Sequence, residues 1–189
     1  MYKRQIYFSK RVTRAVPDGG PIEAHTDLVK KLDYECELAV VLGRDARDVP
    51  AGQTRDYIFG YTILNDVSAR DVQTAHKQWY FGKSLDGFTP IGPCIVTADA
   101  FADYPPRLGI RSFVNGEKRQ DSNTALQIFD IDHVIAELSQ GMTLKAGTII
   151  ATGTPAGVGM GMDPPQFLKP GDVVRCEIEG IGTLTNPVK

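Results

Sequence analysis

Three carboxylate side chains, Glu35, Glu37 and Asp66, have the types and spacing in this chain that most clearly suggest chemistry. The two glutamates precede the apolar run 38–42, which ends at Gly43 and predicts a β-strand. Side chains two residues apart on a strand share a face, about 6–7 Å apart along the backbone, so both glutamates can converge on one ion. Together with Asp66 from a second segment, they form a candidate site for a hard cation.

A Glu-x-Glu pair on a strand is more commonly part of a solvated outer face. Here Ala39 and Val41 continue the face that carries the two glutamates and make it apolar. Two anions that border an apolar surface repel each other and lose hydration, which is unfavourable unless a cation compensates them. The pattern therefore favours a cation site.

Two basic residues could take part in the same chemistry. Lys83 is flanked by aromatic residues and glycine in the segment 79–86. Such surroundings make the neutral amine more accessible, which suits proton transfer or an electrostatic role, although a lone lysine is usually a surface residue. Arg70 could present its guanidinium as a fork to a substrate carboxylate, or pair with neighbouring acids.

The glycine-rich loop 152–161 lacks the G-x-G-x-x-G spacing and the Gly-Lys-Ser/Thr sequence of nucleotide-binding loops. Its glycines would let backbone N–H groups approach an anion closely. A small carboxylate beside the Thr154 hydroxyl and a plain wide turn are both compatible with this sequence.

Composition limits the class of protein. The 189 residues are 42% hydrophobic, enough for one domain with its own core, and the net charge of −2 argues against a nucleic-acid surface. We find no apolar run near 18 residues that would predict a membrane span. Cys36, Cys94 and Cys176 show no C-x-x-C pattern and are predicted to be reduced, mostly buried thiols of a cytoplasmic protein. A small-molecule partner is expected.

Many short strands and few helices are expected along the chain. Asn115-Gly116 predicts a β-hairpin, and a second reversal is expected at 180–182. The segment 131–140 predicts a helix capped by Asp130 or Asp132. The remaining expectations are a weaker helix over 51–57, a buried strand over 148–152 and a tight turn over 169–172.

Five blocks of the sequence, in this order, resemble the fumarylacetoacetate hydrolase (FAH) superfamily. They are DYECELAVV (33–41), GYTILNDVSARDVQ (60–73), GKS (82–84), VNGE (114–117) and TGTPAGVG (152–159). The resemblance extends from about residue 33 to residue 188. It implies a mixed β-rich (α+β) fold, the FAH-type β-roll with a few short helices, and a homodimer.

The resemblance also implies roles for individual residues. Mg²⁺ or Mn²⁺ would be bound by Glu35, Glu37 and Asp66, and Lys83 would be the catalytic residue. Substrate contacts would come from Arg70, Gln73, Lys83 and Thr154. Ligation by carboxylates alone agrees with Mg²⁺ or Mn²⁺ on chemical grounds.

A 2-oxo acid could chelate such an ion through its carboxylate and keto oxygens, and the ion would stabilise the enolate that forms during reaction. We therefore predict an enzyme that acts on 2-oxo, β-diketo or enol acids by hydrolysis, decarboxylation or enol–keto isomerisation. One alternative is a family member that binds metal and a dicarboxylic acid without turnover. Another is a structural β-protein whose carboxylates bind nothing.

FAH-family hydrolases commonly carry a lid segment, with a His and a Glu that activate water, upstream of the first block. The sequence contains no H-x-x-E, and the segment 1–32 resembles the family's strand before the metal motif, with residues 7–10 as its start. We expect a single FAH-like catalytic domain over 1–189 without this lid. Decarboxylation or tautomerisation is then expected before hydrolysis, because neither needs a positioned water.

Overall fold

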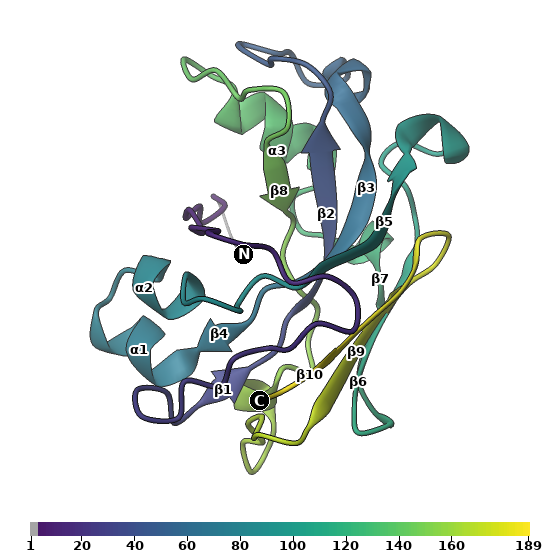
Figure 1. The fold of residues 1–189 in the computed structure, drawn as a ribbon. Helices are drawn as coiled ribbons and strands as arrows, with labels where there is room; N and C mark the ends of the chain where they lie inside the picture. Colours follow the sequence, from purple (N-terminus) through teal and green to yellow (C-terminus); the bar gives the residue numbers. More distant parts are fainter. Residues whose placement is uncertain (1–3) are drawn as a thin grey trace.

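The protein, seen here as a computed structural model, is described for residues 4–189 and consists mainly of two antiparallel four-stranded sheets (Figure 1). The first sheet has the strand order β5-β3-β2-β8, the second has the order β10-β9-β6-β7, and β1 and β4 form a separate pair. The strands are β1 (Leu32–Asp33), β2 (Cys36–Leu42), β3 (Ile58–Asn65), β4 (Ser68–Ala69), β5 (Ile91–Thr97), β6 (Gly109–Val114), β7 (Glu117–Asn123), β8 (Ile149–Ala151), β9 (Val173–Ile178) and β10 (Gly182–Pro187). The expected β-rich α+β architecture is confirmed.

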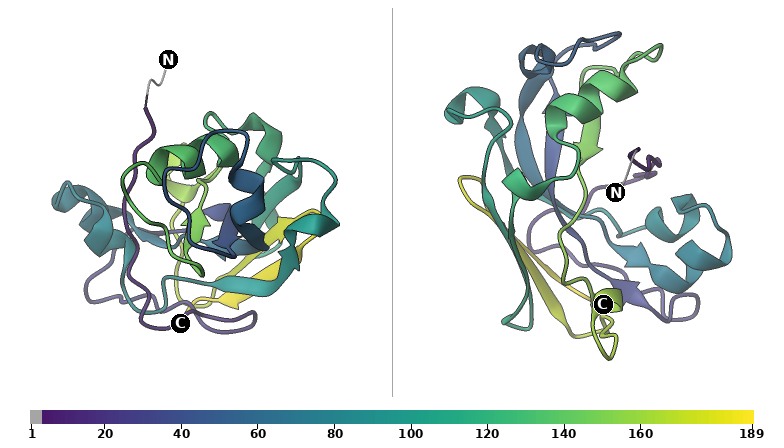
Figure 2. Two further views of the ribbon diagram at one scale, coloured as in Figure 1. Left: turned by 90° about the horizontal axis from the view of Figure 1, so that it is seen from above. Right: turned by 180° about the vertical axis from the view of Figure 1, so that it is seen from behind.

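The helices are few and short. They are α1 (Arg70–Ala75), α2 (Tyr80–Lys83) and α3 (Ile131–Leu138), with 3-10 turns η1 (Thr54–Tyr57), η2 (Ala98–Ala100), η3 (Thr124–Leu126) and η4 (Gly159–Gly161). Helices α1 and α2 lie together beside β4, whereas α3 lies beside β8 at the other end of the molecule (Figures 1 and 2). Within residues 4–189, every helix is too short or too polar to cross a bilayer.

Strand β2 is central because β3 pairs with one of its edges and β8 with the other. All seven of its residues are buried, which explains why its sequence continues as an apolar run instead of alternating with polar residues. Strand β8 (Ile149–Ala151) confirms the strand expected over 148–152. The described chain therefore buries both faces of the segment that carries Glu37.

The predicted turns and the predicted helix are confirmed in their essentials. Asn115 and Gly116 have φ values of 52° and 84°, and they connect β6 to β7 where Val114 pairs with Glu117. Helix α3 begins after Asp130, whose side chain accepts the His133 N–H at 2.8 Å. The β9–β10 reversal and the turn 169–172 also form, whereas the weaker helix expected over 51–57 is reduced to η1.

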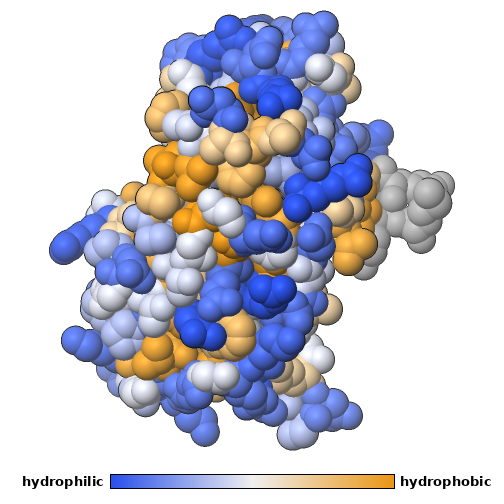
Figure 3. All heavy atoms as spheres, turned by 90° about the vertical axis from the view of Figure 1, so that its right-hand side faces the viewer, coloured by the Kyte–Doolittle hydropathy of each residue, from blue (hydrophilic) through white to orange (hydrophobic). Residues whose placement is uncertain are grey.

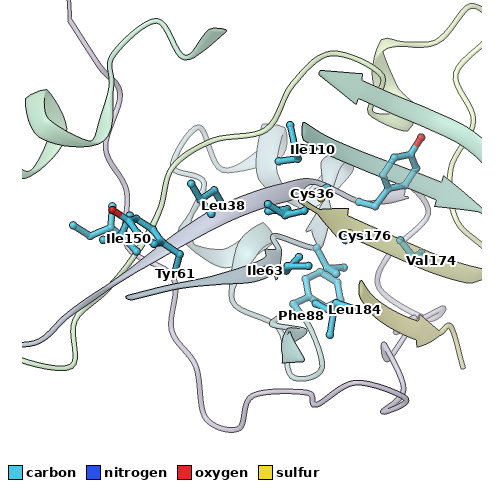
Figure 4. Close-up of a cluster of buried hydrophobic side chains, with 14 of the residues drawn as sticks. Cys36, Leu38, Tyr61, Ile63, Phe88, Ile110, Ile150, Val174, Cys176 and Leu184 are labelled. Carbon is cyan, nitrogen blue, oxygen red and sulfur yellow. The ribbon is translucent and has the colours of Figure 1, made fainter. Parts of the chain in front are cut away.

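The core lies between the two sheets. Side chains of β2, including Cys36 and Leu38, point toward Ile110, Val174 and Cys176 of the second sheet (Figure 4). Cys36 and Cys176 are buried free thiols, as expected, and Cys94 is exposed. Strand β5 was not predicted. It is an edge strand with an exposed apolar stretch, on the side of the molecule where Figure 3 shows hydrophobic residues gathered among hydrophilic ones.

The strand expected to start at residues 7–10 is wrong for the part of the chain that the structure describes. Residues 4–15 have no strand assignment, and Val16 makes an isolated bridge to Pro90. Most of their side chains are exposed, so the segment lacks the paired, half-buried surface that a strand needs. It lies across the molecule as an extended strap near α2 (Figure 1).

Candidate active site

The structure brings Glu35, Glu37 and Asp66 together where β2 and β3 pair. Cys36 lies opposite Asn65 in the antiparallel register, so Glu35, just before β2, is next to Asp66, just after β3. The Asp66 N–H donates to the Glu35 carbonyl at 2.9 Å, and the Glu35 N–H donates to Asn65 Oδ1 at 3.0 Å. One carboxylate oxygen from each of the three acids lies within 4.8 Å of the others.

These carboxylates are not on a solvated face. Glu37 and Asp66 are 3% and 1% exposed, and the Glu35 side chain is 12% exposed. The Glu37 carboxylate accepts the Gly153 N–H at 2.8 Å, and no basic side chain of residues 4–189 pairs with it. A buried anion with one hydrogen bond is costly unless a cation approaches it.

Two of the three carboxylates already have basic partners from the chain itself. Lys83 Nζ, at the end of α2, lies 2.7 Å from Asp66 Oδ2 and 2.9 Å from Glu35 Oε2. Arg70 Nη1, at the start of α1, lies 2.6 Å from Glu35 Oε1. Lys10 Nζ, from the N-terminal strap, lies 2.7 Å from Asp66 Oδ1.

The surroundings shift the pKa values of two carboxylates of the centre in opposite directions. Burial, together with the negative charges of Asp66 and Glu35, raises the pKa of Glu37 well above its usual range. Burial alone would also raise the pKa of Asp66, but the ammonium groups of Lys10 and Lys83 outweigh it and lower that pKa. The centre therefore contains one carboxylate, Asp66, that two lysines stabilise, and another, Glu37, that lacks a counter-charge.

The prediction that the surroundings of Lys83 make its neutral form more accessible is wrong. Burial does act to lower the pKa of Lys83, but the carboxylates of Asp66 and Glu35 outweigh it and raise that pKa above its usual value. The Phe8 ring also favours the charged form, because Nζ lies 5.4 Å from its centroid. Lys83 is thus held as an ammonium ion.

The glycine-rich loop does bind carboxylates, but they belong to the protein itself. Besides Gly153 N–H on Glu37, the N–H groups of Gly159 and Met160 donate to Asp33 at 2.7 and 3.0 Å. A Cβ on Gly159 would lie 2.1 Å from the Gln166 carbonyl oxygen, so this close approach requires glycine. Asp33 in turn accepts Arg70 Nε at 2.9 Å and thereby orients the guanidinium.

Arg70 and Gln73 lie side by side at the centre. Both are buried, and Arg70 Nη1 donates to Gln73 Oε1 at 3.2 Å. Arg70 Nη2 is buried without a hydrogen-bond partner among the described residues. A buried guanidinium N–H without an acceptor is costly, so this atom is a candidate donor to an anionic ligand.

Thr154 is less clearly available to a ligand. Its hydroxyl donates to the Cys36 carbonyl at 2.9 Å and accepts Gln120 Nε2 at 2.8 Å. The hydroxyl proton is therefore already used, and contact with a substrate oxygen would require it to turn away from β2. Gln120 also accepts the Cys36 N–H, so it ties the loop to the start of β2.

Sequence reasoning missed three residues of this site, namely Lys10, Asp33 and Gln120. Lys10 and Gln120 reach their partners across 56 and 84 positions of the chain, respectively. No local periodicity signals such contacts. Asp33 stands directly before the carboxylate motif, and its position could have marked it as a partner for Arg70.

A cleft with a volume of about 390 Å³ borders the loop at Gly153 and Thr154. Its lining is uncharged and includes the side chains of Ser122, Asn123, Gln127 and Phe129. Such a lining favours an uncharged portion of a ligand over a second carboxylate.

The donor set fits Mg²⁺ or Mn²⁺. The three candidate ligands are carboxylates within 4.8 Å of one another, without Cys or His. A carboxylate has about four lone-pair sites, so Glu35 and Asp66 can keep their basic partners and still offer an oxygen to an ion. The ion would also supply the counter-charge that Glu37 lacks.

Comparison with known proteins identifies the family of the chain. A family model described as fumarylacetoacetate (FAA) hydrolase C-terminal matches residues 2–189. Oxaloacetate tautomerase YisK of Bacillus subtilis is 45% identical over 183 residues, which cover 97% of this chain and 60% of that protein. The chain thus spans about 60% of the length of the curated relatives it matches.

Solved structures give the same assignment. The fumarylacetoacetate hydrolase of Exiguobacterium antarcticum is 50% identical with a TM-score of 0.95, over 98% of this chain and 66% of that one. The 5-carboxymethyl-2-hydroxymuconate delta-isomerase of Mycobacterium smegmatis is 43% identical with a TM-score of 0.80, over 91% of this chain and 64% of that one. The chain therefore belongs to the fumarylacetoacetate hydrolase family.

Proposed function

We propose that this chain carries the active centre of a divalent-metal-dependent enzyme that acts on 2-oxo acids. The observation that carries the proposal is the group of three carboxylates within 4.8 Å of one another, of which Glu37 and Asp66 are buried, and Lys83 pairs with Asp66 and Glu35. Glu35, Glu37 and Asp66 would hold Mg²⁺ or Mn²⁺. When bound, the cation supplies a Lewis acid that polarises the keto group of the substrate.

The basic residues bind and orient the substrate. Arg70 Nη2, buried and without a partner among the described residues, donates to the substrate carboxylate, while Asp33 and Gln73 fix the plane of the guanidinium. Thr154 contacts the substrate at the opposite edge, where its loop meets Glu37 through Gly153. The uncharged cleft beside this loop receives the remainder of the substrate.

Lys83 holds the proton that the reaction needs. Its raised pKa keeps Nζ protonated, and two of its three N–H donors face Asp66 and Glu35. The third can face the substrate oxygen, where it stabilises developing negative charge; in ketonisation the ammonium gives its proton to the neighbouring carbon and the amine takes back the proton of the enol hydroxyl, so that no proton is left over. This arrangement serves enol–keto tautomerisation directly and also serves decarboxylation, in which the same charge develops as CO₂ leaves.

The names of two relatives support tautomerisation or isomerisation as the reaction, whereas the Exiguobacterium antarcticum relative is named a hydrolase. The relatives include an oxaloacetate tautomerase and a 5-carboxymethyl-2-hydroxymuconate delta-isomerase. Both reactions move a proton and need no water positioned by a separate base. A homodimer and a cytoplasmic location remain predictions from the family resemblance and the composition; sedimentation of the purified protein measures the first.

To test the proposal, turnover is measured with oxaloacetate, an acylpyruvate and a 2-hydroxydienedioate, each in the presence of Mg²⁺, Mn²⁺ or EDTA. We expect metal-dependent turnover of at least one substrate, and Glu35→Gln should abolish both turnover and Mn²⁺ binding. The control is Glu117→Gln, because the Glu117 side chain is 68% exposed at the β6–β7 turn. Ligand-induced stabilisation without turnover would favour a metal and dicarboxylate binder, and unchanged Mn²⁺ affinity in Glu35→Gln would refute the metal site.

A further inference from the structure

Lys10 reaches the carboxylate centre from a strap that is otherwise exposed. The strap contacts three other segments. Tyr7 Oη donates to Glu137 Oε2 at 2.5 Å, Phe8 packs edge-on against Trp79 with ring centroids 5.3 Å apart, and the Arg11 N–H donates to Ser84 Oγ at 3.0 Å. Only 11% of the Lys10 side chain is exposed, so it leaves the strap and enters the interior.

All three N–H donors of the Lys10 ammonium have acceptors. These are Asp66 Oδ1 at 2.7 Å, the Val67 carbonyl at 3.3 Å and the Lys83 carbonyl. Lys10 therefore has no donor left for a substrate. It differs in this respect from Lys83, which uses two donors on carboxylates of the centre.

The two lysines hold opposite oxygens of one carboxylate. Lys10 binds Oδ1 of Asp66 and Lys83 binds Oδ2, which fixes the plane of the carboxylate. Lys10 also binds the carbonyl of Lys83 itself and so ties the end of α2 to Asp66. Groups that orient a metal ligand in this way commonly change metal affinity by about 10–100-fold when they are removed.

We propose that Lys10 is a positioning residue for the carboxylate centre, which presents Asp66 to the divalent cation and sets the distance between Asp66 and Lys83. The inference rests on the proposed function, because it concerns the same cation. It assigns a role to the N-terminal strap, whose other side chains remain largely at the surface.

The direction in which Mn²⁺ affinity changes when Lys10 is replaced tests the inference. If Lys10 were only a nearby positive charge, its removal would strengthen cation binding, because like charges repel. If Lys10 positions Asp66, its removal weakens cation binding although a repulsive charge is lost. We expect Lys10→Met to bind Mn²⁺ about 10-fold more weakly by titration calorimetry, and Lys10→Arg to recover part of that loss.

The matched control is Arg11→Met. It removes the same charge from the next residue of the strap, and the Arg11 side chain makes no hydrogen bond or ion pair with residues 4–189. Circular dichroism verifies that each variant is folded. Equal or tighter Mn²⁺ binding by folded Lys10→Met, or no difference from Arg11→Met, would overturn the inference alone. A wild-type protein that bound no Mn²⁺ would overturn it together with the proposed function.

Discussion

The two faces of β2 are both buried, but by different means. On one face Cys36 and Leu38 pack among apolar side chains of the second sheet (Figure 4). On the other face Glu37 lies at the carboxylate centre, where counter-charges and N–H donors must come from other segments. The apolar face needs complementary volume, whereas the polar face needs partners in specific positions.

Because of this difference, substitutions on the two faces of β2 should affect different properties of the protein. Substitutions on the apolar face should reduce the free energy of unfolding and leave the cation affinity nearly unchanged. Substitutions on the polar face should change cation affinity and turnover, and some of them should even stabilise the cation-free protein, because an uncompensated buried charge is removed. Four substitutions test this division, from the largest expected effect to the smallest.

Lys83→Met should have the largest effect, because it removes one partner from the buried Asp66 carboxylate and from the partly buried Glu35 carboxylate. Loss of one member of a buried ion pair typically costs about 3–5 kcal/mol of unfolding free energy. Turnover should fall at least about 100-fold, since the proposed proton donor is lost. Urea unfolding in EDTA and turnover at saturating Mn²⁺ measure the two effects. Lys30→Met is the control, because Lys30 is exposed, and a Lys83→Met variant as stable as this control would contradict the ion-pair argument.

Leu38→Ala tests the apolar face of the same strand. Leu38 is fully buried between the sheets, and truncating a buried leucine typically costs about 2–5 kcal/mol. Mn²⁺ affinity should stay within about 2-fold, because the side chain points away from the centre. Leu126→Ala, at a leucine that is 74% exposed, should change stability by less than about 0.5 kcal/mol. A large loss of Mn²⁺ affinity in folded Leu38→Ala would show that the two faces are coupled.

The two faces also differ in how far the sequence predicts them. The apolar run 38–42 and the spacing of Glu35, Glu37 and Asp66 predict β2 and the carboxylate group correctly, because both depend on local pattern. The partners of the carboxylates depend on contacts between distant segments, so Lys10 was missed and the direction of the Lys83 pKa shift was wrong. Local pattern cannot reveal which charges will become neighbours.

Short or interrupted elements were also beyond prediction. Helices α1 and α2 have six and four residues, too few for a helical period to be recognised. Strand β5 contains Gly92 and Pro93, which normally argue against a strand, and it is tolerated at the edge of the sheet. The segment 7–10 has the apolar residues of a strand, but its side chains are used as separate anchors to α2, α3 and Asp66.

Glu37→Gln should stabilise the cation-free protein, whereas Lys83→Met and Leu38→Ala should destabilise it. Burial and the neighbouring carboxylates raise the pKa of Glu37 in the folded state, so the folded protein binds this proton more tightly than the unfolded chain does. The cation-free protein should therefore lose stability as the pH rises from the ordinary glutamate pKa, about 4.3, through the raised folded-state pKa. Glu37→Gln should abolish this decline, stabilise the protein above that range by at least about 1 kcal/mol, and abolish Mn²⁺ binding.

The measurement is thermal unfolding in EDTA across pH 4–8, with Glu117→Gln as the control for loss of an exposed carboxylate. The lowered pKa of Asp66 has the opposite effect on the pH dependence. The stability that Asp66 contributes is present above the ordinary aspartate pKa and is lost only as the pH falls through the folded-state pKa. The Glu37 effect is therefore identified by the difference between wild type and Glu37→Gln at each pH. Parallel stability curves for the two proteins would mean that Glu37 is not an uncompensated charge.

The smallest effect is expected from Thr154→Val, compared with Thr152→Val on the same segment. Both hydroxyls donate to carbonyls of β2, Thr152 to Leu38 at 2.8 Å and Thr154 to Cys36 at 2.9 Å. Each substitution removes two hydrogen bonds, because Thr154 also accepts Gln120 Nε2 and Thr152 also accepts Gln127 Nε2, and each bond should contribute about 1 kcal/mol of unfolding free energy. Thr152 also lines the cleft, where valine keeps its size, but only the Thr154 hydroxyl is proposed to form a hydrogen bond with the substrate. Only Thr154→Val should therefore raise KM, by about 5-fold for a hydrogen bond of that strength. Equal KM values for the two variants would place the Thr154 hydroxyl among the groups that hold β2, and would leave substrate binding to Arg70 and Gln73 on the polar face.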